Sequence, residues 1–354
     1  MLMLMANLIT KIVTALTPKR SWAQFSLATM FVIVTVLCVW LAAHVRATNR
    51  QRAALAAIKE LGGRWFYDYQ LGDNGINYNR NEPPVPKWLL DRLDIDHFAN
   101  VDRVELWAPE HRDPNSLSLA LTDVKKLGSL RSLWMQIDQA KRLTPTEVEL
   151  LASLTGVRCI EFMPDKKTDA LVETIERLPN LEGLDLLLCE VGANGLRHIG
   201  RMTNLRRLRI MASEVGDRGL ADIAGLESLV ELNLIGPGVT DTGLVQLERL
   251  KSLEMLSLEG SEITGAGLAP IARLKSLREL HLLCNEVTDA GLAHLRELTE
   301  LRVLYVDEAQ VTDSGLAHLR LLKKLERLGI YHTKVTQAGI AELQRALPNC
   351  DIYQ

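Results

Sequence analysis

The chain has 354 residues, of which 47% are hydrophobic and only 5% are aromatic. Its formal net charge at pH 7 is −3. A nucleic-acid-binding surface needs a basic stripe that releases counterions, so we expect no nucleic-acid partner. The five cysteines are scattered and do not share one position of a repeating pattern. They predict buried free thiols rather than a disulfide framework.

The first feature along the chain is an uncharged run of 19 residues, FSLATMFVIVTVLCVWLAA, from Phe25 to Ala43. This length suffices to cross a bilayer core, so it predicts a single-pass transmembrane anchor behind a leader of residues 1–24. A cleaved signal peptide is the alternative, but no clean Ala-x-Ala site follows the run. Basic residues on its two sides are nearly balanced. A short N-terminal tail commonly stays inside, so we expect the rest of the chain outside the cytoplasm.

A small N-terminal segment separates the predicted anchor from the repeats. Residues 44–62 contain strong helix formers and end at a Gly-Gly pair, which predicts a helical linker. Arg64–Gln70 predicts a strand, and Gly72–Pro86, with Asn, Gly and three prolines, predicts a loop. Trp88–Phe98 then predicts a helix. We interpret residues 63–100 as a cap, because the repeats would otherwise expose an apolar end.

From residue 101 onward the chain is repetitive. A phrase whose cleanest copies read Val-Thr-Asp-x-Gly-Leu begins every 24 residues, at Val191, Val215, Val239, Ile263, Val287, Val311 and Val335. After each phrase the apolar residues follow helical spacing and then period two, so one unit is a short helix, a bend and a strand. A fixed period of this length predicts a solenoid over residues 101–354, with ten full strands and a terminal half-unit.

The strand motif resembles that of the leucine-rich-repeat family, Leu-x-x-Leu-x-Leu-x-x-Asn/Cys. Residues 181–189 and 277–285 match it through the last position, where other copies carry Ser, Pro, Ala or Thr. The resemblance implies an α/β solenoid with a curved parallel sheet inside and short helices outside, here preceded by a transmembrane helix. The whole chain also resembles a bacterial group of membrane-anchored repeat proteins.

Catalytic motifs are missing from the sequence, and two sets of aligned residues resemble metal ligands. The sequence contains no phosphate-binding loop, zinc-protease motif or serine-hydrolase elbow, so we expect no enzyme and no cofactor. His294 and His318 share one position in adjacent units, but no third ligand aligns with them, so we interpret both as solvated helix residues. The phrase also forms a column of acids: Asp217, Asp241, Asp289 and Asp313. Gly265 interrupts this column, and helix N-capping accounts for each Asp better than a calcium ladder does.

The strand face remains as the candidate site. Residues between the core leucines of each strand point to the concave surface, and we expect partner binding there. The candidate residues are Trp134, Glu161, Met163, Asp185, Leu187, Arg209, Met211, Asn233, Ile235, His281, Tyr305 and Tyr331. They include an apolar run, from Met163 to Ile235, which the core does not need and which is typical of a protein- or peptide-binding surface. Ser257 belongs to the same face and is expected to meet solvent.

These observations predict a membrane-anchored repeat protein that binds a protein or peptide and has no catalytic activity. The cysteine-containing members of the family imply one alternative, a substrate-recognition subunit of a ubiquitin ligase, although no F-box-like helical segment precedes the repeats. A structural protein of the cell envelope is a second alternative. An enzyme acting on the concave face is a third, but it would need a convergent acid–base pair.

Overall fold

The computed structural model describes residues 27–354 apart from gaps at 73–74, 77–82, 84, 86, 91–94, 98, 108–115, 138–142, 165–167, 212–214 and 284–285. The predicted leader and the first two residues of the predicted span lie outside the described residues. The chain divides into two compact units, Met1–Arg52 and Ala53–Gln354.

The first unit is described from helix α2 (Leu27–Glu60), whose last residues belong to the second unit. The helix is continuous through the predicted span and the predicted linker. Its large apolar side chains between Val32 and Leu41 are 44–65% exposed. Within the part of the chain that the structure describes, Val32–Glu60 is the single helical stretch long and apolar enough to cross a membrane.

The second unit contains a 12-stranded sheet in the order β1-β4-β5-β6-β7-β8-β9-β10-β11-β12-β13-β14. β1 (Arg64–Tyr67) pairs antiparallel with β4, and the strands from β4 to β14 pair parallel, each with the next unit's strand. The parallel strands are β4 (Val101–Trp107), β5 (Ser132–Ile137), β6 (Cys159–Pro164), β7 (Gly183–Leu186), β8 (Arg207–Met211), β9 (Glu231–Ile235), β10 (Met255–Glu259), β11 (Glu279–His281), β12 (Val303–Tyr305), β13 (Arg327–Gly329) and β14 (Asp351–Tyr353).

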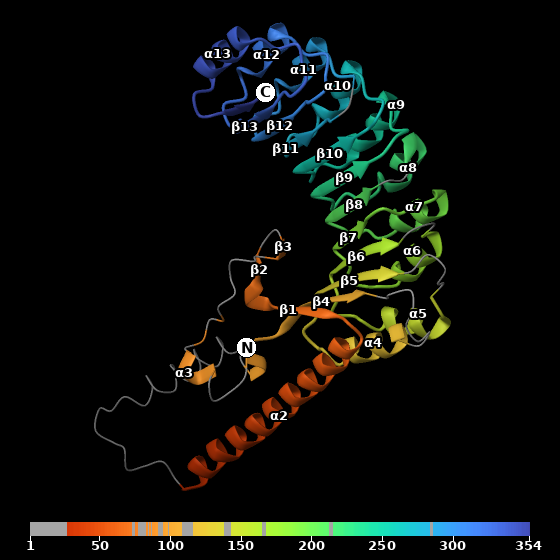
Figure 1. Ribbon diagram of the computed structural model, residues 1–354, viewed down its shortest axis with the longest axis vertical. Coiled ribbons are helices and arrows are strands. Elements are labelled where there is room, and N and C mark those ends of the chain that lie inside the picture. The colour runs from red at the N-terminus through yellow and green to blue at the C-terminus, as the bar shows by residue number, and fades with distance from the viewer. Residues whose placement is uncertain are drawn as a thin grey trace, which may run out of the picture. The chain divides into compact units, whose positions relative to one another are not determined.

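Short helices cover the outer face of this sheet, and the strands line the inner, concave face (Figure 1). The helices are α4 (Ser116–Lys125), α5 (Pro145–Ala152), α6 (Asp169–Ile175), α7 (Ala193–Ile199), α8 (Gly216–Ile223), α9 (Asp241–Leu244), η3 (Val245–Arg249), η4 (Gly265–Gly267), α10 (Leu268–Ile271), α11 (Asp289–Leu295), α12 (Asp313–Leu319) and α13 (Gln337–Ala346). The α/β solenoid predicted from the 24-residue period is confirmed.

One aliphatic layer between sheet and helices forms the core. Leu256 of β10 pairs in register with Leu232 and Leu280 of the neighbouring strands, and all three are fully buried. Each such side chain contributes roughly 2 kcal/mol through burial. Because every unit repeats the same layer, neighbouring units bury one another's leucines, and this explains why the period holds without a slip.

The N-terminal segment packs on the open edge of the first repeat strand. Ile58 at the end of α2 is fully buried and belongs to the same core cluster as Val104 of β4. α2 ends as predicted at the Gly-Gly pair, with Gly62 at φ 82°. A Cβ on Gly63 would lie 2.6 Å from Ile58 Cγ2 and 3.1 Å from the Glu105 carbonyl oxygen, so glycine permits this close approach.

Two local predictions in this segment were inaccurate, and a third falls partly outside the described residues. The strand starting at Arg64 ends at Tyr67, because the Gln70 side chain accepts a hydrogen bond from the Tyr67 amide (3.0 Å) and closes a 3-10 turn, η1 (Asp68–Gln70). The predicted loop contains a small antiparallel pair, β2 (Leu71–Gly72) with β3 (Gly75–Ile76). The predicted helix from Trp88 to Phe98 is described only as α3 (Lys87–Leu90) and η2 (Ile95–His97); residues 91–94 and 98 lie outside the described residues.

The repeated phrase acts as an interlock between units. The threonine of the phrase, rather than the residue after it, stands at the N-cap of the helix of its own unit. For example, the Thr264 hydroxyl accepts a hydrogen bond from the Ala266 amide at 3.2 Å. The Asp241 carboxylate of the preceding unit accepts from the Thr264 amide at 2.8 Å and from its hydroxyl at 2.5 Å. The same pair of bonds joins Asp217 to Thr240, Asp289 to Thr312 and Asp313 to Thr336. The prediction that each Asp caps its own helix was therefore wrong.

The glycine of the phrase makes room for that carboxylate. A Cβ on Gly267 would lie 2.2 Å from Asp241 Oδ1, which no real side chain tolerates. The same contact recurs at Gly243 with Asp217, and at Gly315 with Asp289. Glycine in the first helical turn is thus required by the preceding unit, and its low helix propensity is outweighed.

Candidate functional site

The concave face carries three rows of side chains, each running from strand to strand. We call the row that the sequence analysis placed between the core leucines the central row; the upstream and downstream rows lie two residues earlier and later. The central row is Glu105, Trp134, Glu161, Asp185, Arg209, Asn233, Ser257, His281, Tyr305, Gly329 and Tyr353. The upstream row is Arg103, Ser132, Cys159, Gly183, Arg207, Glu231, Met255, Glu279, Val303, Arg327 and Asp351.

The downstream row follows the same 24-residue period, partly beyond the ends of the strands. Its members from β6 onward are Met163, Leu187, Met211, Ile235, Glu259, Leu283, Asp307 and Tyr331. All twelve candidate residues therefore lie in the central or downstream row and share one face. Sequence reasoning missed the upstream row, although the period-two alternation that located the other rows also predicts it.

The expectation that Ser257 meets solvent was wrong. Ser257 is only 3% exposed, while its row neighbours Asn233 and His281 are half-buried. Parallel strands lie about 4.8 Å apart, so the larger side chains on either side cover a serine between them. Alternation predicts which face a residue points to, but its neighbours decide how much of it water can reach.

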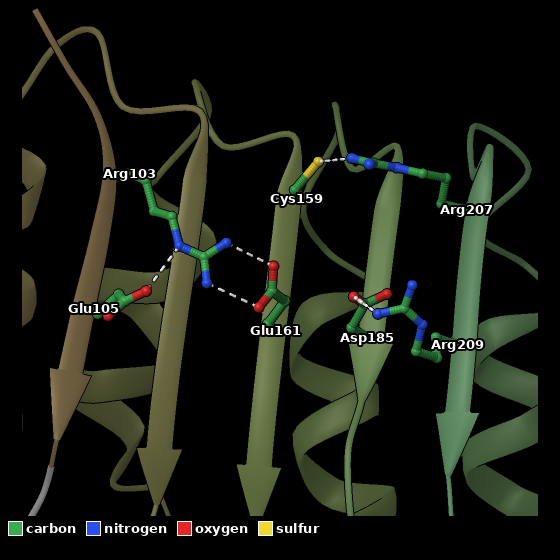
Figure 2. A network of polar contacts seen from close by, with 7 residues as sticks. All are labelled: Arg103, Glu105, Cys159, Glu161, Asp185, Arg207 and Arg209. Atoms are coloured by element: carbon green, nitrogen blue, oxygen red, sulfur yellow. Dashed lines mark hydrogen bonds and ion pairs between the residues drawn. The ribbon is translucent and has the colours of Figure 1, made fainter. Parts of the chain in front are cut away.

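A partly buried ion-pair network occupies the N-terminal part of the concave face (Figure 2). The Arg103 guanidinium on β4 reaches across β5 and makes a two-bond contact with the Glu161 carboxylate, at 2.7 and 2.9 Å. Its Nε donates to Glu105 at 3.1 Å. The Arg103 side chain is only 13% exposed, so a charge-assisted, two-bond geometry of this kind fixes side chains of β4 and β6 to one another across β5.

A second arginine holds the next pair of acids. Arg209 contacts Asp185 at 3.3 Å on one side and Glu231 at 3.2 Å on the other. Burial raises the pKa of Asp185 to about 6 against the opposing effect of Arg209, and the nearby charges of Glu161 and Glu231 raise it further. Asp185 is therefore mostly ionised at pH 7, and its charge is lost as the pH falls through 6.

A third arginine lies over a glycine. Arg207 Nη2 approaches Cys159 Sγ at 2.9 Å, crossing β7 at Gly183 (Figure 2). A Cβ on Gly183 would lie 3.0 Å from the sulfur and 3.4 Å from the guanidinium, so glycine leaves room for the crossing. Burial raises the pKa of the Cys159 thiol although Arg207 opposes it. The thiol stays protonated at neutral pH and is not an activated nucleophile.

These side chains enclose little space. The pocket lined by Cys159, Asp185, Arg207 and Arg209 has a volume of about 40 Å³. Sites for drug-sized molecules have volumes of several hundred Å³. The network is better suited to contact a partner's surface than to enclose a small substrate.

Apolar side chains line the downstream row beside this network. Met163, Leu187, Met211 and Ile235 are each partly exposed, on four consecutive strands about 5 Å apart. We call these four residues the apolar stripe. Leu188, 58% exposed at φ 55°, extends it. The same position of the unit is left-handed at Gly236, Gly260, Glu308 and His332, so the bend after the strand sets this backbone and the choice of leucine is local.

The predictions about metals concern residues outside the concave face. His294 lies exposed on helix α11 and His318 is half-exposed on α12. Among the described residues, no three His, Cys, Asp or Glu side chains gather as a metal site would require. The aspartates of the phrase are instead engaged by the threonines of the next unit.

Comparison with known families identifies the repeat. Residues 273–295 match the sequence model described as the leucine-rich repeat. This segment contains β11 and α11, one full period of the interlocked stack. This segment is a leucine-rich repeat, and the stack that contains it has the architecture of a leucine-rich-repeat solenoid. Cys189 matches the last position of the family motif, whereas Ser261 and Ala309, both buried, replace its Asn or Cys in later units of the array.

An internalin from Listeria monocytogenes is structurally similar, with a TM-score of 0.49 and 14% sequence identity, over 75% of this chain and 92% of that chain. No curated protein matches the chain.

Proposed function

We propose that this leucine-rich-repeat protein binds a protein or peptide partner on the N-terminal part of its concave face. The observation that carries the proposal is the apolar stripe, partly exposed beside a network of ion pairs. Apolar side chains of this kind anchor a partner through buried area, whereas fixed charges set its orientation. The candidate residues Trp134, Asn233, His281, Tyr305 and Tyr331 extend the same face.

Replacing the centre of the stripe tests this proposal. In the variant Met211→Glu with Ile235→Glu, two charges face the partner, and each lost anchor costs roughly 2 kcal/mol of binding. The dissociation constant of a partner identified with the wild-type chain should rise about a hundredfold or more. Surface plasmon resonance measures this, with thermal unfolding as the check on folding.

The matched control places the same charges on the outer helices, in the variant His294→Glu with His318→Glu. Its affinity should equal that of the wild-type protein. Unchanged affinity of the stripe variant, or an equal loss of affinity in the two variants, would show that the partner does not bind at the apolar stripe.

We also propose that α2 anchors the protein in a membrane, with the repeats outside the cytoplasm. The apolar, exposed side chains of α2 support an anchor, and a cleaved signal sequence is its competitor. The division into leader (1–24), anchor (25–43), linker (44–62), cap (63–100) and repeats (101–354) belongs to this proposal.

An anchored protein should stay in the membrane fraction after a carbonate wash, because burial of an apolar helix in the bilayer core does not depend on salt or pH. Immunoblotting of the two fractions checks this. Recovery of a shortened, soluble repeat domain would show cleavage instead. Protease digestion of intact cells reports the side: loss of the repeats places them outside.

We propose a binding role rather than a catalytic one. The carboxylates of the network are held by guanidinium groups, and the thiol beside them stays protonated, so the arrangement lacks an activated nucleophile with a base. The envelope-protein alternative predicts high abundance without a discrete partner, and the ubiquitin-ligase alternative predicts a stable complex with a ligase scaffold. A pull-down from the native membrane distinguishes all three.

A further inference from the structure

The two halves of the concave face differ in how their acids are paired. From β4 to β9 the three rows hold four carboxylates, and each contacts an arginine: Arg103 contacts Glu105 and Glu161, and Arg209 contacts Asp185 and Glu231. From β10 to β14 the rows again hold four carboxylates: Glu259, Glu279, Asp307 and Asp351. Among the described residues, no lysine or arginine lies within 4.0 Å of any of these four carboxylates. Glu279 lies 4.0 Å from the ring of His281, which carries a charge only when it is protonated.

The remaining charges in this C-terminal half do not compensate the acids. Arg327 is the one lysine or arginine among the described residues of the three rows from β10 to β14. Burial lowers the pKa of His281 further below neutrality, so its ring adds no positive charge at pH 7. Burial also raises the pKa of Asp307, although the Tyr331 amide donates a hydrogen bond to its Oδ1 at 2.7 Å and opposes that shift. A cation supplied from outside would stabilise its ionised form.

Three adjacent members of the central row present polar atoms without partners. Asn233 Oδ1 and His281 Nε2 are buried and make no hydrogen bond. Ser257 lies between them and is only 3% exposed. Within the described residues its hydroxyl has no hydrogen-bond partner. Buried polar groups are normally paired, and leaving one unpaired costs about 1–3 kcal/mol. These atoms indicate a ligand that brings both donors and acceptors.

Aromatic side chains complete this half. Tyr305 lies over Gly329, where a Cβ would stand 2.2 Å from its ring, and its ring contacts His281 edge-on at 4.9 Å. Tyr331 and Tyr353 are 43% and 38% exposed. Tyrosine faces attract ammonium and guanidinium groups and also cover the aliphatic stems of lysine and arginine.

We propose that the concave face from β10 to β14 binds an extended, lysine- or arginine-rich segment of the partner polypeptide. This assignment rests on the proposed function and names the chemistry of the partner at a second part of the same face. The peptide backbone would run along the central row, where its amides meet Ser257 and His281, and its end would reach Asn233 on the adjoining strand β9. Side chains of an extended chain alternate between its two sides, and acids stand on both: Glu259 and Asp307 downstream, Glu279 and Asp351 upstream.

The dimensions agree with this arrangement. Five strands about 4.8 Å apart span roughly 19 Å, which corresponds to about six residues of extended chain. A linear polyamine offers the same cationic groups but has no carbonyl oxygens, so it would leave the donors of the central row unpaired. The unpartnered polar atoms therefore favour a polypeptide.

The test uses the full chain in detergent and a fluorescein-labelled hexalysine peptide, with fluorescence anisotropy as the readout. Hexalysine should bind, hexaglutamate should not, and binding should weaken as sodium chloride is raised. The variant Glu259→Gln with Asp307→Asn should weaken hexalysine about tenfold, because two charge pairs are lost. The control Glu149→Gln with Glu173→Gln removes equal charge from exposed sites on α5 and α6 and should leave the affinity unchanged.

Two results would overturn the assignment: equal affinity of hexalysine for the wild type and the Glu259/Asp307 variant, or displacement of hexalysine by spermine as strong as that by unlabelled hexalysine. The second result would make the ligand a polyamine. The apolar-stripe variant Met211→Glu with Ile235→Glu should still bind hexalysine. A third result would separate the two proposals: the apolar-stripe variant loses the native partner, while neither variant changes hexalysine binding. That result would support the proposed function and reject the binding of a basic segment at β10 to β14.

Discussion

Replacing Leu256 with Asp should destabilise the solenoid by at least about 4 kcal/mol. Leu256 is fully buried and packs between Leu232 and Leu280 of the adjacent units. The change removes roughly 2 kcal/mol of apolar burial and places a carboxylate where no partner exists, or forces it to be protonated. Because the core layer is shared between units, the damage extends to both neighbours. Thermal unfolding of the full chain in detergent, followed by circular dichroism, measures the effect.

The control makes the same substitution where the side chain meets solvent. Leu321 is 62% exposed in the turn after α12, so Leu321→Asp should change the unfolding free energy by no more than about 0.5 kcal/mol. Equal losses in the two variants would contradict the assignment of Leu256 to the shared core. Ser257 is unsuitable as a control because the structure buries it.

Gly267→Ala is expected to cost roughly 2 kcal/mol, although alanine is the better helix former. Gly267 is helical at φ −65°, so the backbone itself accepts alanine. The new Cβ would stand 2.2 Å from Asp241 Oδ1, and this carboxylate is tied to Thr264 by two hydrogen bonds. It can move only by breaking them. Urea unfolding measures the loss.

A double-mutant cycle separates this contact from a general effect of alanine. In the Asp241→Ala background the carboxylate is absent, so Gly267→Ala should become neutral or stabilising. Gly225→Ala is the control, because its Cβ would meet no atom within 4 Å. An equal loss from Gly267→Ala in both backgrounds would show that the carboxylate is not the cause.

The sequence predicted the fold well because the solenoid is specified by period. Leu232, Leu256 and Leu280 are 24 residues apart, and the ladder pairs exactly that spacing. Where the pattern switches from helical spacing to period two, the chain passes from helix to strand. The N-terminal segment lacks a period, and single side chains such as Gln70 decide its turns, so its elements were predicted less accurately.

The candidate site could be predicted only in part, because lateral neighbours carry information that the pattern of one unit does not. Arg103 meets Glu161 across an intervening strand, 58 positions along the chain. Asp241 finds its partner in the following unit rather than in its own helix. Ser257 is buried by residues one unit away on each side. In each case the strand or helix that carries the residue was predicted, and the identity of its neighbour in another unit was not.

The interlock also bears on how such an array can lengthen. A unit with the intact phrase presents an Asp to the unit after it and a Thr and Gly to the unit before it, so an inserted copy of 24 residues between two such units satisfies both flanks without any compensating change. In the phrase beginning at Val335, Gln337 stands where the intact copies have Asp, and its side-chain amide donates to Gln354 at 2.7 Å; Gly265 replaces the same Asp in an earlier copy. Duplication can therefore extend the concave face by whole strands, adding recognition surface in fixed increments.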